Sequence, residues 1–308
     1  MNPSRFLRKC LTDPPAAWRS LKLVGRSLYG SAFWTVSPKA PLRWRLAGGG
    51  RLWLHPGHSF THCFWPAIDG YEPDVRTFIE TFLRPGQTFL DCGANVGYFS
   101  IVAGHRVGPT GRVLAVEANP TTFGLLSDNL RLNGFGDGVH CALTNEPGDV
   151  TLHMSRAGGD VYSSLRREGI NNGQDVESFV VPGRLLDDVL ADRKIDRVDM
   201  VKVDIEGAEL DVLRSAPRLM EIDRPLIICE YGMNTWPAFG ASFEQLLAML
   251  EVRNYAVGVF DTRARRVVPP GPELRQSAYA NLILFPEERR GELMPQSLGP
   301  LSHQGNRS

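Results

Sequence analysis

The stretch QTFLDCGANVGYFS, residues 87–100, decides the fold. It begins with QTFLD, a short and mostly apolar run that predicts a buried strand, and the turn CGANVG follows directly. The segment YFSIVAGHRV (98–107) has the length and apolar content of a helix packed on a sheet, and Gly108-Pro109 end it. A strand, a glycine-containing turn and a helix in succession are typical of the first unit of a parallel sheet.

Strand-like and helix-like segments alternate along the rest of the chain. Further apolar runs predict strands at 112–117, 139–143, 198–204, 225–231, 255–260 and 279–285. Helical spacing of apolar residues occurs at 75–83, 120–133, 185–193, 208–216 and 242–254. Such alternation predicts an α/β fold, in which helices cover both faces of a mostly parallel sheet. Residues 145–182 break the alternation and predict an extra strand pair with an exposed loop.

Charge and turn residues divide the chain into an N-terminal extension, a domain and a tail. Residues 1–51 carry ten Lys/Arg and one acid, a net charge of +9, and since the formal net charge of the chain is zero, residues 52–308 carry −9. Prolines interrupt residues 1–40 and predict short helices or a loosely docked arm. The segment RWRLAGGGRLWLHPG (43–57) alternates around three glycines and predicts a β-hairpin. The expected divisions are a basic arm with a hairpin, an α/β domain and a flexible tail, at 1–66, 67–290 and 291–308.

Composition excludes several classes of protein. Apolar residues make up 43% and charged residues 22%, which excludes a disordered chain, a coiled coil and a collagen-like fibre. No run approaches the ~18 apolar residues of a membrane-spanning helix, and the first residues lack the apolar run of a secretory signal. The five cysteines are odd in number and widely spaced, which predicts reduced thiols in a cytoplasmic protein.

The basic extension predicts no specific partner. We favour a solvated arm, with docking to an acidic partner or to an anionic membrane surface as alternatives. The extension lacks the stacking aromatic residues that nucleic-acid-binding modules use, so we expect no specific nucleic-acid contact.

Polar residues after the predicted strands are expected to meet at one edge of the sheet, because ligands of such sheets bind outside the carboxyl ends of the strands. Gly93 and Gly97 let the backbone of the first loop approach a ligand closely. The spacing is GxxxG rather than GxGxxG, and Asp91 before it suits an ammonium group better than a pyrophosphate. Glu117 ends the second strand, where a carboxylate can accept both hydroxyls of a ribose. The alternatives are a tight turn that binds nothing and a solvated acid at a strand end.

Three motifs, in this order, resemble the FkbM-type family of class I, S-adenosylmethionine-dependent methyltransferases. They are DCGANVGYFS (91–100), VLAVEANP (113–120) and DMVKVDIEGAELDVL (199–213). Further similarity lies in YEPD, SSL, LLDDVL, IICEY and ANLILF, so that the resemblance covers roughly residues 67–286. It implies a Rossmann-like, seven-stranded, mostly parallel sheet whose last strand is antiparallel. It also implies an enzyme that methylates a hydroxyl of a sugar, a glycan or a secondary metabolite.

The resemblance also implies where S-adenosylmethionine binds. The methionine part of the cofactor would lie among residues of the first loop, which are Asp91, Gly93, Ala94, Asn95 and Gly97. Asn95 replaces the central glycine of the general class I loop, in agreement with the FkbM-type variant. Glu117 would hold the ribose hydroxyls. Asn119, Ala142 and Leu143 would flank the adenine.

A second group of carboxyl residues is expected beside the reactive end of the cofactor. Lys202 and Asp204 share one face of a strand, and Asp204 and Glu206 emerge at its carboxyl end. Glu230 ends the next strand and would face the same pocket. A hydroxyl nucleophile must lose a proton, for which a carboxylate base is suited. We favour Asp204 as the base or substrate anchor, with Glu206 second and Glu230 binding substrate or supporting Asp204.

Other interpretations of these residues stay open. Asp204 and Glu206 would, in one alternative, only cap the next helix and neutralise Lys202. In another, Asp204 and Glu230 would hold a divalent metal, since hard cations take oxygen ligands, although no local spacing indicates it. At the level of the whole protein, the alternatives are a nicotinamide-dependent oxidoreductase, which the missing GxGxxG opposes, and a catalytically inactive cofactor-binding module.

A histidine-rich segment lies just before the domain. His55, His58, His62 and Cys63 fall within nine residues, but their spacing is not that of a common zinc site. We favour packing or surface histidines over a metal site. The neighbouring aromatic residues Phe60, Phe64 and Trp65 are candidates for the roof of a substrate pocket.

Overall fold

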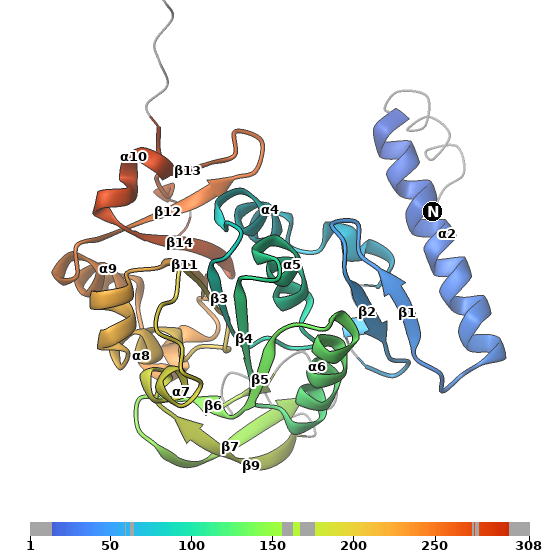
Figure 1. Cartoon of the computed structure of the whole chain (residues 1–308), viewed down its shortest axis with the longest axis horizontal. Helices are drawn as coiled ribbons and strands as arrows, with labels where there is room; N and C mark the ends of the chain where they lie inside the picture. The colour runs from blue at the N-terminus through green and yellow to red at the C-terminus, as the bar shows by residue number, and fades with distance from the viewer. Residues whose placement is uncertain are drawn as a thin grey trace, which may run out of the picture.

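A mixed sheet forms the centre of the computed structural model, which describes residues 14–58, 60–61, 65–155, 163–166, 176–272, 274 and 277–295. Its strands are β3 (Thr88–Cys92), β4 (Arg112–Glu117), β5 (Asp137–His140), β10 (Met200–Val203), β11 (Leu226–Tyr231), β12 (Tyr255–Asp261), β13 (Arg266–Val268) and β14 (Ala280–Pro286). Their order across the sheet is β13-β12-β14-β11-β10-β3-β4-β5 (Figure 1). Strands β5, β4, β3, β10 and β11 run parallel, whereas β14 is antiparallel to β11 and β12. The predicted Rossmann-like sheet with an antiparallel last strand is confirmed, and β13 adds an eighth strand at the edge.

Helices cover both faces of the sheet. They are α4 (Pro73–Phe82), α5 (Tyr98–Val107), α6 (Pro120–Asn133), α7 (Leu186–Asp192), α8 (Glu209–Arg214), α9 (Phe243–Val252) and α10 (Arg290–Leu293). Short helical turns are η1 (Trp65–Gly70), η3 (Arg218–Asp223), η4 (Trp236–Phe239) and η6 (Glu287–Arg289). Phe89 of β3 packs into the core that contains residues of α4 and α5, and the next residue, Leu90, packs into the core that contains residues of α7, α8 and α9. This alternation explains why the strand is apolar at consecutive positions.

A second sheet of four strands lies at one end of the central sheet. Its strands are β6 (Ala142–Leu143), β7 (Gly148–Ser155), β8 (Ser163–Ser164) and β9 (Val176–Arg184), in the order β6-β9-β7-β8. The antiparallel pair β7–β9 confirms the extra strand pair predicted within residues 145–182. The single strand predicted at 139–143 is wrong, because β5 ends at His140, opposite Glu117, the last residue of β4. Beyond that point the backbone finds hydrogen-bond partners on β9 instead, as β6.

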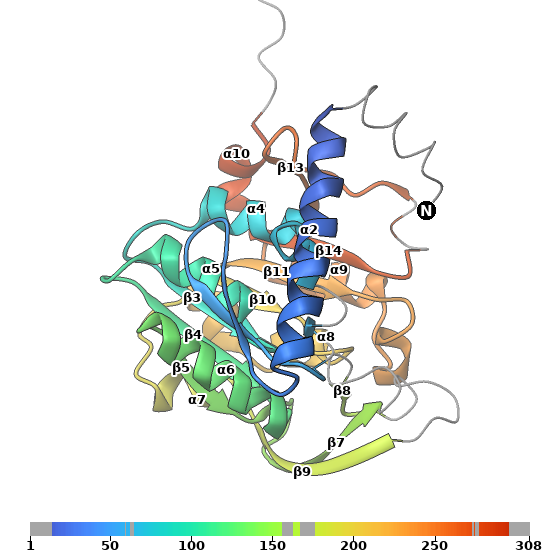
Figure 2. The ribbon, with the colours of Figure 1, turned by 90° about the vertical axis from the view of Figure 1, so that its right-hand side faces the viewer.

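The N-terminal extension packs beside this domain as a helix and a hairpin (Figure 2). Strands β1 (Leu42–Arg45) and β2 (Arg51–Leu54) pair antiparallel around the glycine turn, as predicted. The short helices expected in residues 1–40 are wrong for the described part, where α2 (Pro14–Val36) is one helix of 23 residues. Proline is tolerated in the first turn of a helix, so Pro14-Pro15 begins α2 rather than excluding it.

Contacts with the domain hold this extension in place. The Arg26 guanidinium forms an ion pair with Asp69 of η1 and lies 5.2 Å from the ring centre of Trp44. The Trp53 backbone N–H donates to Asn129 Oδ1 of α6 at 2.7 Å. At the other terminus, Leu293 of α10 is fully buried, so the folded chain passes the predicted boundary at residue 290. The rest of the predicted tail, from residue 296, lies outside the described residues.

Candidate functional site

A cavity of about 850 Å³ lies where the carboxyl ends of β3, β4, β10 and β11 meet. This volume is within the usual range for small-molecule sites. Most of the predicted site residues line it, namely Gly93, Ala94, Asn95, Glu117, Ala142, Leu143, Asp204, Glu206 and Glu230. The expectation that polar residues after several strands meet at one edge of the sheet is therefore confirmed by the geometry, while the role of each residue stays a prediction.

The loop between β3 and α5 has a backbone that touches the loop after β10. Gly93 has a φ of 77°, and a Cβ at this position would lie 1.7 Å from the carbonyl oxygen of Asp204. The glycine is thus required for contact between two loops of the protein itself. Asn95 has a φ of 50° in the left-handed region, and its Oδ1 accepts the Val96 N–H at 2.8 Å. The loop is therefore held in one shape before any ligand binds.

Glu117 connects this loop to the start of α6. Its Oε2 accepts the Asn95 N–H at 2.9 Å and its Oε1 accepts the Asn119 N–H at 2.8 Å. The side chain is 8% exposed, and burial raises the pKa of Glu117 to about 7, although these backbone N–H groups act in the opposite direction. Each carboxyl oxygen keeps a second acceptor direction for a ligand hydroxyl.

Three predicted cofactor residues do not line the cavity. Asp91 is fully buried behind the loop and accepts the Ser100 hydroxyl at 2.6 Å. Asn119 caps α6, since its Oδ1 accepts the N–H groups at the first turn of that helix. Gly97 has a φ of 88°, and a Cβ there would lie 2.7 Å from Leu126 Cδ1. These residues shape the site from behind it.

Lys202 is the cation at the centre of the site. Its side chain is buried in β10, opposite Asp91 of β3, and its Nζ donates to Asp204 Oδ2 at 2.6 Å. Burial alone would lower the pKa of Lys202, but the negative charges of Asp204, Asp91 and Glu72 outweigh burial and raise it. The ammonium form of Lys202 is therefore stable, and it pairs with the Asp204 side chain.

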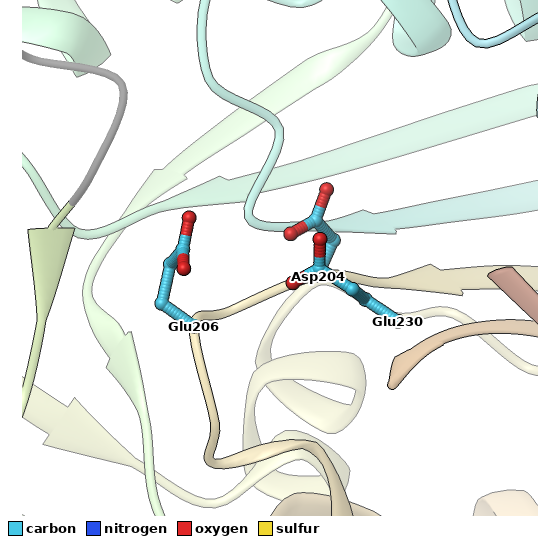
Figure 3. Close-up of side chains that lie close together, drawn as sticks. All are labelled: Asp204, Glu206 and Glu230. Carbon is cyan, nitrogen blue, oxygen red and sulfur yellow. The ribbon is translucent and has the colours of Figure 1, made fainter. Parts of the chain in front are cut away.

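Asp204, Glu206 and Glu230 bring three carboxyl groups together (Figure 3). Each offers an oxygen atom, and these atoms lie within 4.8 Å of one another. Burial, followed by the charges of Asp204 and Glu206, raises the pKa of Glu230 well above its ordinary value. Burial and the charges of Asp204 and Glu209 raise the pKa of Glu206 to about 8. Glu206 therefore favours its protonated form at pH 7. Asp204, in contrast, is paired with the Lys202 ammonium.

Glu209 is a residue of the site that sequence reasoning missed. It is fully buried, and its Oε1 accepts the N–H groups of Ile205 at 2.8 Å and Gly207 at 3.2 Å. Burial raises the pKa of Glu209 to about 7. Glu209 thus fixes the loop that carries Asp204 and Glu206. The signal in the sequence that could have identified Glu209 is its position as an acidic residue in the first turn of a predicted helix.

The structure gives no independent support for a metal ion. The three carboxyl groups have a spacing that a cation accepts, but acidic clusters are common without one. The Lys202 ammonium already supplies a positive charge to Asp204. In the histidine-rich segment, His58 Nδ1 accepts the Phe60 N–H at 3.3 Å, and His62 and Cys63 lie outside the described residues. Within the part of the chain that is described, His55 and His58 belong to no group of metal-ligating side chains.

The half of the cavity away from Glu117 has walls that sequence reasoning largely missed. Side chains before α4, at the start of α5 and before β14 form them: Phe60, Tyr71, Glu72, Tyr98, Phe99 and Tyr279. Phe60 was expected near a substrate pocket and does line the cavity. The side chains of Phe64 and Trp65, expected there too, lie outside the described residues.

Comparison with known proteins matches the part of the chain that contains these motifs. A family model described as "Methyltransferase FkbM domain" matches residues 91–257. This match contains all three motifs that carry the resemblance noted in the sequence, and it confirms that resemblance. In the described part of the chain, no helix has the length and apolar character needed to span a membrane.

Individual relatives match over part of their length. Methyltransferase sdnD of Sordaria araneosa is 29% identical over 202 residues, which are 56% of this chain and 75% of that protein. The 31-O-demethyl-FK506 methyltransferase FkbM of Streptomyces tacrolimicus is 31% identical over 174 residues, 46% of this chain and 65% of that protein. Hexuronic acid methyltransferase AglP of Haloferax volcanii is 24% identical over 151 residues, 49% of this chain and 58% of that protein. The crystal structure of an FkbM methyltransferase from Methylobacillus flagellatus aligns with a TM-score of 0.42 at 17% identity, covering 75% of this chain and 56% of that one.

Proposed function

This chain belongs to the FkbM family of methyltransferases, and we propose that it transfers a methyl group from S-adenosylmethionine to a hydroxyl oxygen of a sugar, a glycan or a secondary metabolite. One observation carries the proposal. A single cavity joins the loop after β3 and Glu117 to the carboxyl groups of Asp204 and Glu230. A cofactor held at one end of this cavity would present its reactive group to an acceptor held at the other.

The residues present fit S-adenosylmethionine. Both oxygens of Glu117 can accept ribose hydroxyls, and the apolar side chains of Ala142 and Leu143 suit the faces of an adenine. The backbone from Gly93 to Val96 lines the cavity beside them and suits the methionine part. When bound, the cofactor supplies an electrophilic methyl group on a sulfonium sulfur.

Asp204 is the residue that accepts the proton of the acceptor hydroxyl. Lys202 holds its carboxyl group in place through a hydrogen bond of 2.6 Å. Glu230 is hydrogen-bonded to Asp204, and burial and the neighbouring charges raise its pKa well above its ordinary value. Glu206 is the second candidate for the base above pH about 8, where it loses its proton.

Two relatives support an oxygen acceptor. The printed name of the Streptomyces tacrolimicus protein contains a 31-O-demethyl substrate, and that of the Haloferax volcanii protein contains a hexuronic acid. Both kinds of molecule carry hydroxyl groups, and Asp204 offers a base for one. The predicted cytoplasmic location stays a prediction.

The first experiment separates this function from the alternatives by ligand binding. S-adenosylhomocysteine is expected to raise the Tm of the full chain, whereas NAD is not. A rise with NAD alone would reverse the assignment in favour of an oxidoreductase. Incubation with labelled S-adenosylmethionine and a library of polyols, glycans and cell extract, followed by mass spectrometry, then identifies the methylated product.

A further inference from the structure

Glu72 is a carboxyl residue of the cavity that the proposed function does not use. It precedes α4 with a φ of 35°, an unusual backbone conformation for a residue other than glycine. Its Oε2 atom is buried and has no hydrogen-bond partner among the described residues. An unpaired buried carboxyl oxygen lowers the stability of the fold. Residues with a strained backbone conformation, such as Glu72, are concentrated at ligand-binding sites. A donor group on a ligand would satisfy this atom.

Aromatic rings fix the position of Glu72. The neighbouring Tyr71 is hydrogen-bonded to the Glu72 carboxyl group, so the two side chains form one unit. The Tyr71 ring stacks on Phe99 at 5.7 Å and meets Phe60 and Tyr98 edge-on, each at 5.4 Å between ring centres. The wall is therefore rigid, with apolar ring faces beside one free carboxyl oxygen.

The same wall is close to the reacting end of the site. Lys202 Nζ lies 5.2 Å from the ring centre of Phe99, and its charge acts on Glu72 as well as on Asp204. Tyr279, before β14, lies at the exposed side of the cavity, close enough to Glu72, Asp204 and Glu230 for their charges to act on it. An acceptor with one hydroxyl at Asp204 would thus present its neighbouring groups to Glu72.

The charges of this half of the cavity favour some acceptors over others. Glu72, Asp204, Glu206 and Glu230 all line it. Of the described residues that line the cavity, Lys202 is the one with a positive charge, and Asp204 already binds it. An acceptor carboxylate would therefore lose its hydration among carboxyl groups without gaining a free cation. A hydroxyl or an ammonium group would instead donate to the unpaired Glu72 oxygen.

We propose that Glu72 determines acceptor specificity by accepting a hydrogen bond from the acceptor, and that the acceptor is an uncharged or cationic hydroxylated ring rather than an acidic one. This inference rests on the proposed function, because it assumes that the acceptor is methylated on a hydroxyl. Beyond the proposed function, the inference specifies the charge of the acceptor and names Glu72 as the residue that selects it.

Binding of three probes that share one ring tests the proposal. The methyl glycosides of glucose, glucosamine and glucuronic acid are uncharged, cationic and anionic, and each is titrated into the full chain saturated with S-adenosylhomocysteine. Ligand-observed NMR is expected to show the first two binding in the millimolar range, ~1–10 mM, and the glucuronide binding at least about tenfold more weakly. In Glu72→Gln the glucoside should bind about tenfold more weakly, the loss expected for one hydrogen bond.

Glu80→Gln is the matched control, because Glu80 lies in α4, the helix directly after Glu72, but pairs with Arg76. It should leave all three affinities within about twofold, as surface changes usually do. The proposal is overturned if the glucuronide binds as tightly as the glucoside, if Glu72→Gln binds the glucoside like the wild type, or if none of the three rings binds. The wild-type preference needs no variant, so it tests the charge of the acceptor even if Glu72→Gln does not fold. Failure of S-adenosylhomocysteine to bind would instead contradict the proposed function itself, and the inference with it.

Discussion

Lys202 Nζ lies 2.6 Å from Asp204 Oδ2, two residues away along the same strand end, and this pair is the electrostatic centre of the cavity. Asp91 lies opposite Lys202 on β3, and Glu230 is hydrogen-bonded to Asp204 from β11. One ammonium group thus acts on carboxyl groups from two neighbouring strand ends, and Glu230 of a third strand joins them through Asp204. The first two predictions concern this pair.

Lys202→Met should strongly destabilise the protein at neutral pH. The variant leaves the fully buried Asp91 and the partly exposed Asp204 without their cation. Leaving a buried charge unpaired in this way typically lowers the free energy of unfolding by about 3–5 kcal/mol. Urea unfolding at pH 7 measures the change. An unchanged midpoint would show that the pair does not stabilise the fold.

Asp204→Asn should abolish most of the methyl transfer without loss of cofactor binding. An amide cannot accept the hydroxyl proton, and a positioned general base contributes about 10²–10⁴-fold to a rate. The measurement is the rate of S-adenosylhomocysteine formation with the identified acceptor, together with the Kd of S-adenosylhomocysteine. The control is Asp211→Asn, in the adjoining helix α8, whose carboxyl group pairs with Arg214. Near wild-type rates in Asp204→Asn would move the role of base to Glu206.

The affinity for S-adenosylhomocysteine should fall as the pH falls below about 7. Burial raises the pKa of Glu117 to about 7, so the carboxylate that accepts the ribose hydroxyls becomes protonated below that pH. The Kd is then expected to rise by up to about tenfold per pH unit. Calorimetric titration between pH 5.5 and 8.5, about 1.5 units to either side of that value, tests this. Glu117→Gln should bind more weakly at every pH and lose the pH dependence, and a wild-type Kd that stays constant would contradict the assignment.

Glu209 should make the protein less stable as the pH rises from 4.5 to about 7. Its pKa in the folded state is about 7 against an ordinary 4.5, so in this window the unfolded chain has lost a proton that the folded chain keeps. More protons bound to the folded state mean that the free energy of unfolding falls with rising pH, here by up to about 3 kcal/mol. Glu209→Gln removes this contribution, while Glu117 and Glu206 still act in the same direction. Urea unfolding at pH 4 and pH 8, roughly the two ends of this window, measures the free energy of unfolding of both proteins. Relative to the wild type, Glu209→Gln should be more stable at pH 8 than at pH 4.

Gly93→Ala should destabilise the protein and displace the loop that carries Asp204. The added Cβ would meet a backbone carbonyl at 1.7 Å, which no side-chain rotation relieves. Left-handed strain and overpacking together predict a loss of at least about 3 kcal/mol. Gly134→Ala is the control, since Gly134 has a similar φ of 70° but a Cβ there meets no atom of the described residues within 4 Å. Equal losses in both variants would show that φ alone explains the glycine at position 93.

The sequence by itself determined the type of fold and where most of its elements lie. Helices α5 and α6 have the predicted bounds, because apolar spacing begins and ends them together with Pro120, Gly108 and Gly134. The order of strands and helices then requires the carboxyl ends of several strands to share one edge, and this placed Glu117, Asp204 and Glu230 around one cavity. These are consequences of local chain chemistry and of the few ways in which a parallel sheet can be covered.

Only the tertiary structure decided which of those side chains face the cavity and what surrounds them. Asp91, near the end of β3, and Asn119, before α6, lie next to the site but turn toward protein partners. Glu209 folds back onto its own loop, and Glu72 enters the cavity from a segment more than 100 residues before Lys202. Contacts of this kind depend on how distant segments pack and on which buried charged groups lie next to one another. Local patterns of apolar residues in the sequence do not contain this information. The same packing sets the pKa of each carboxyl group, since burial and neighbouring charges, rather than residue type, determine which of them holds a proton.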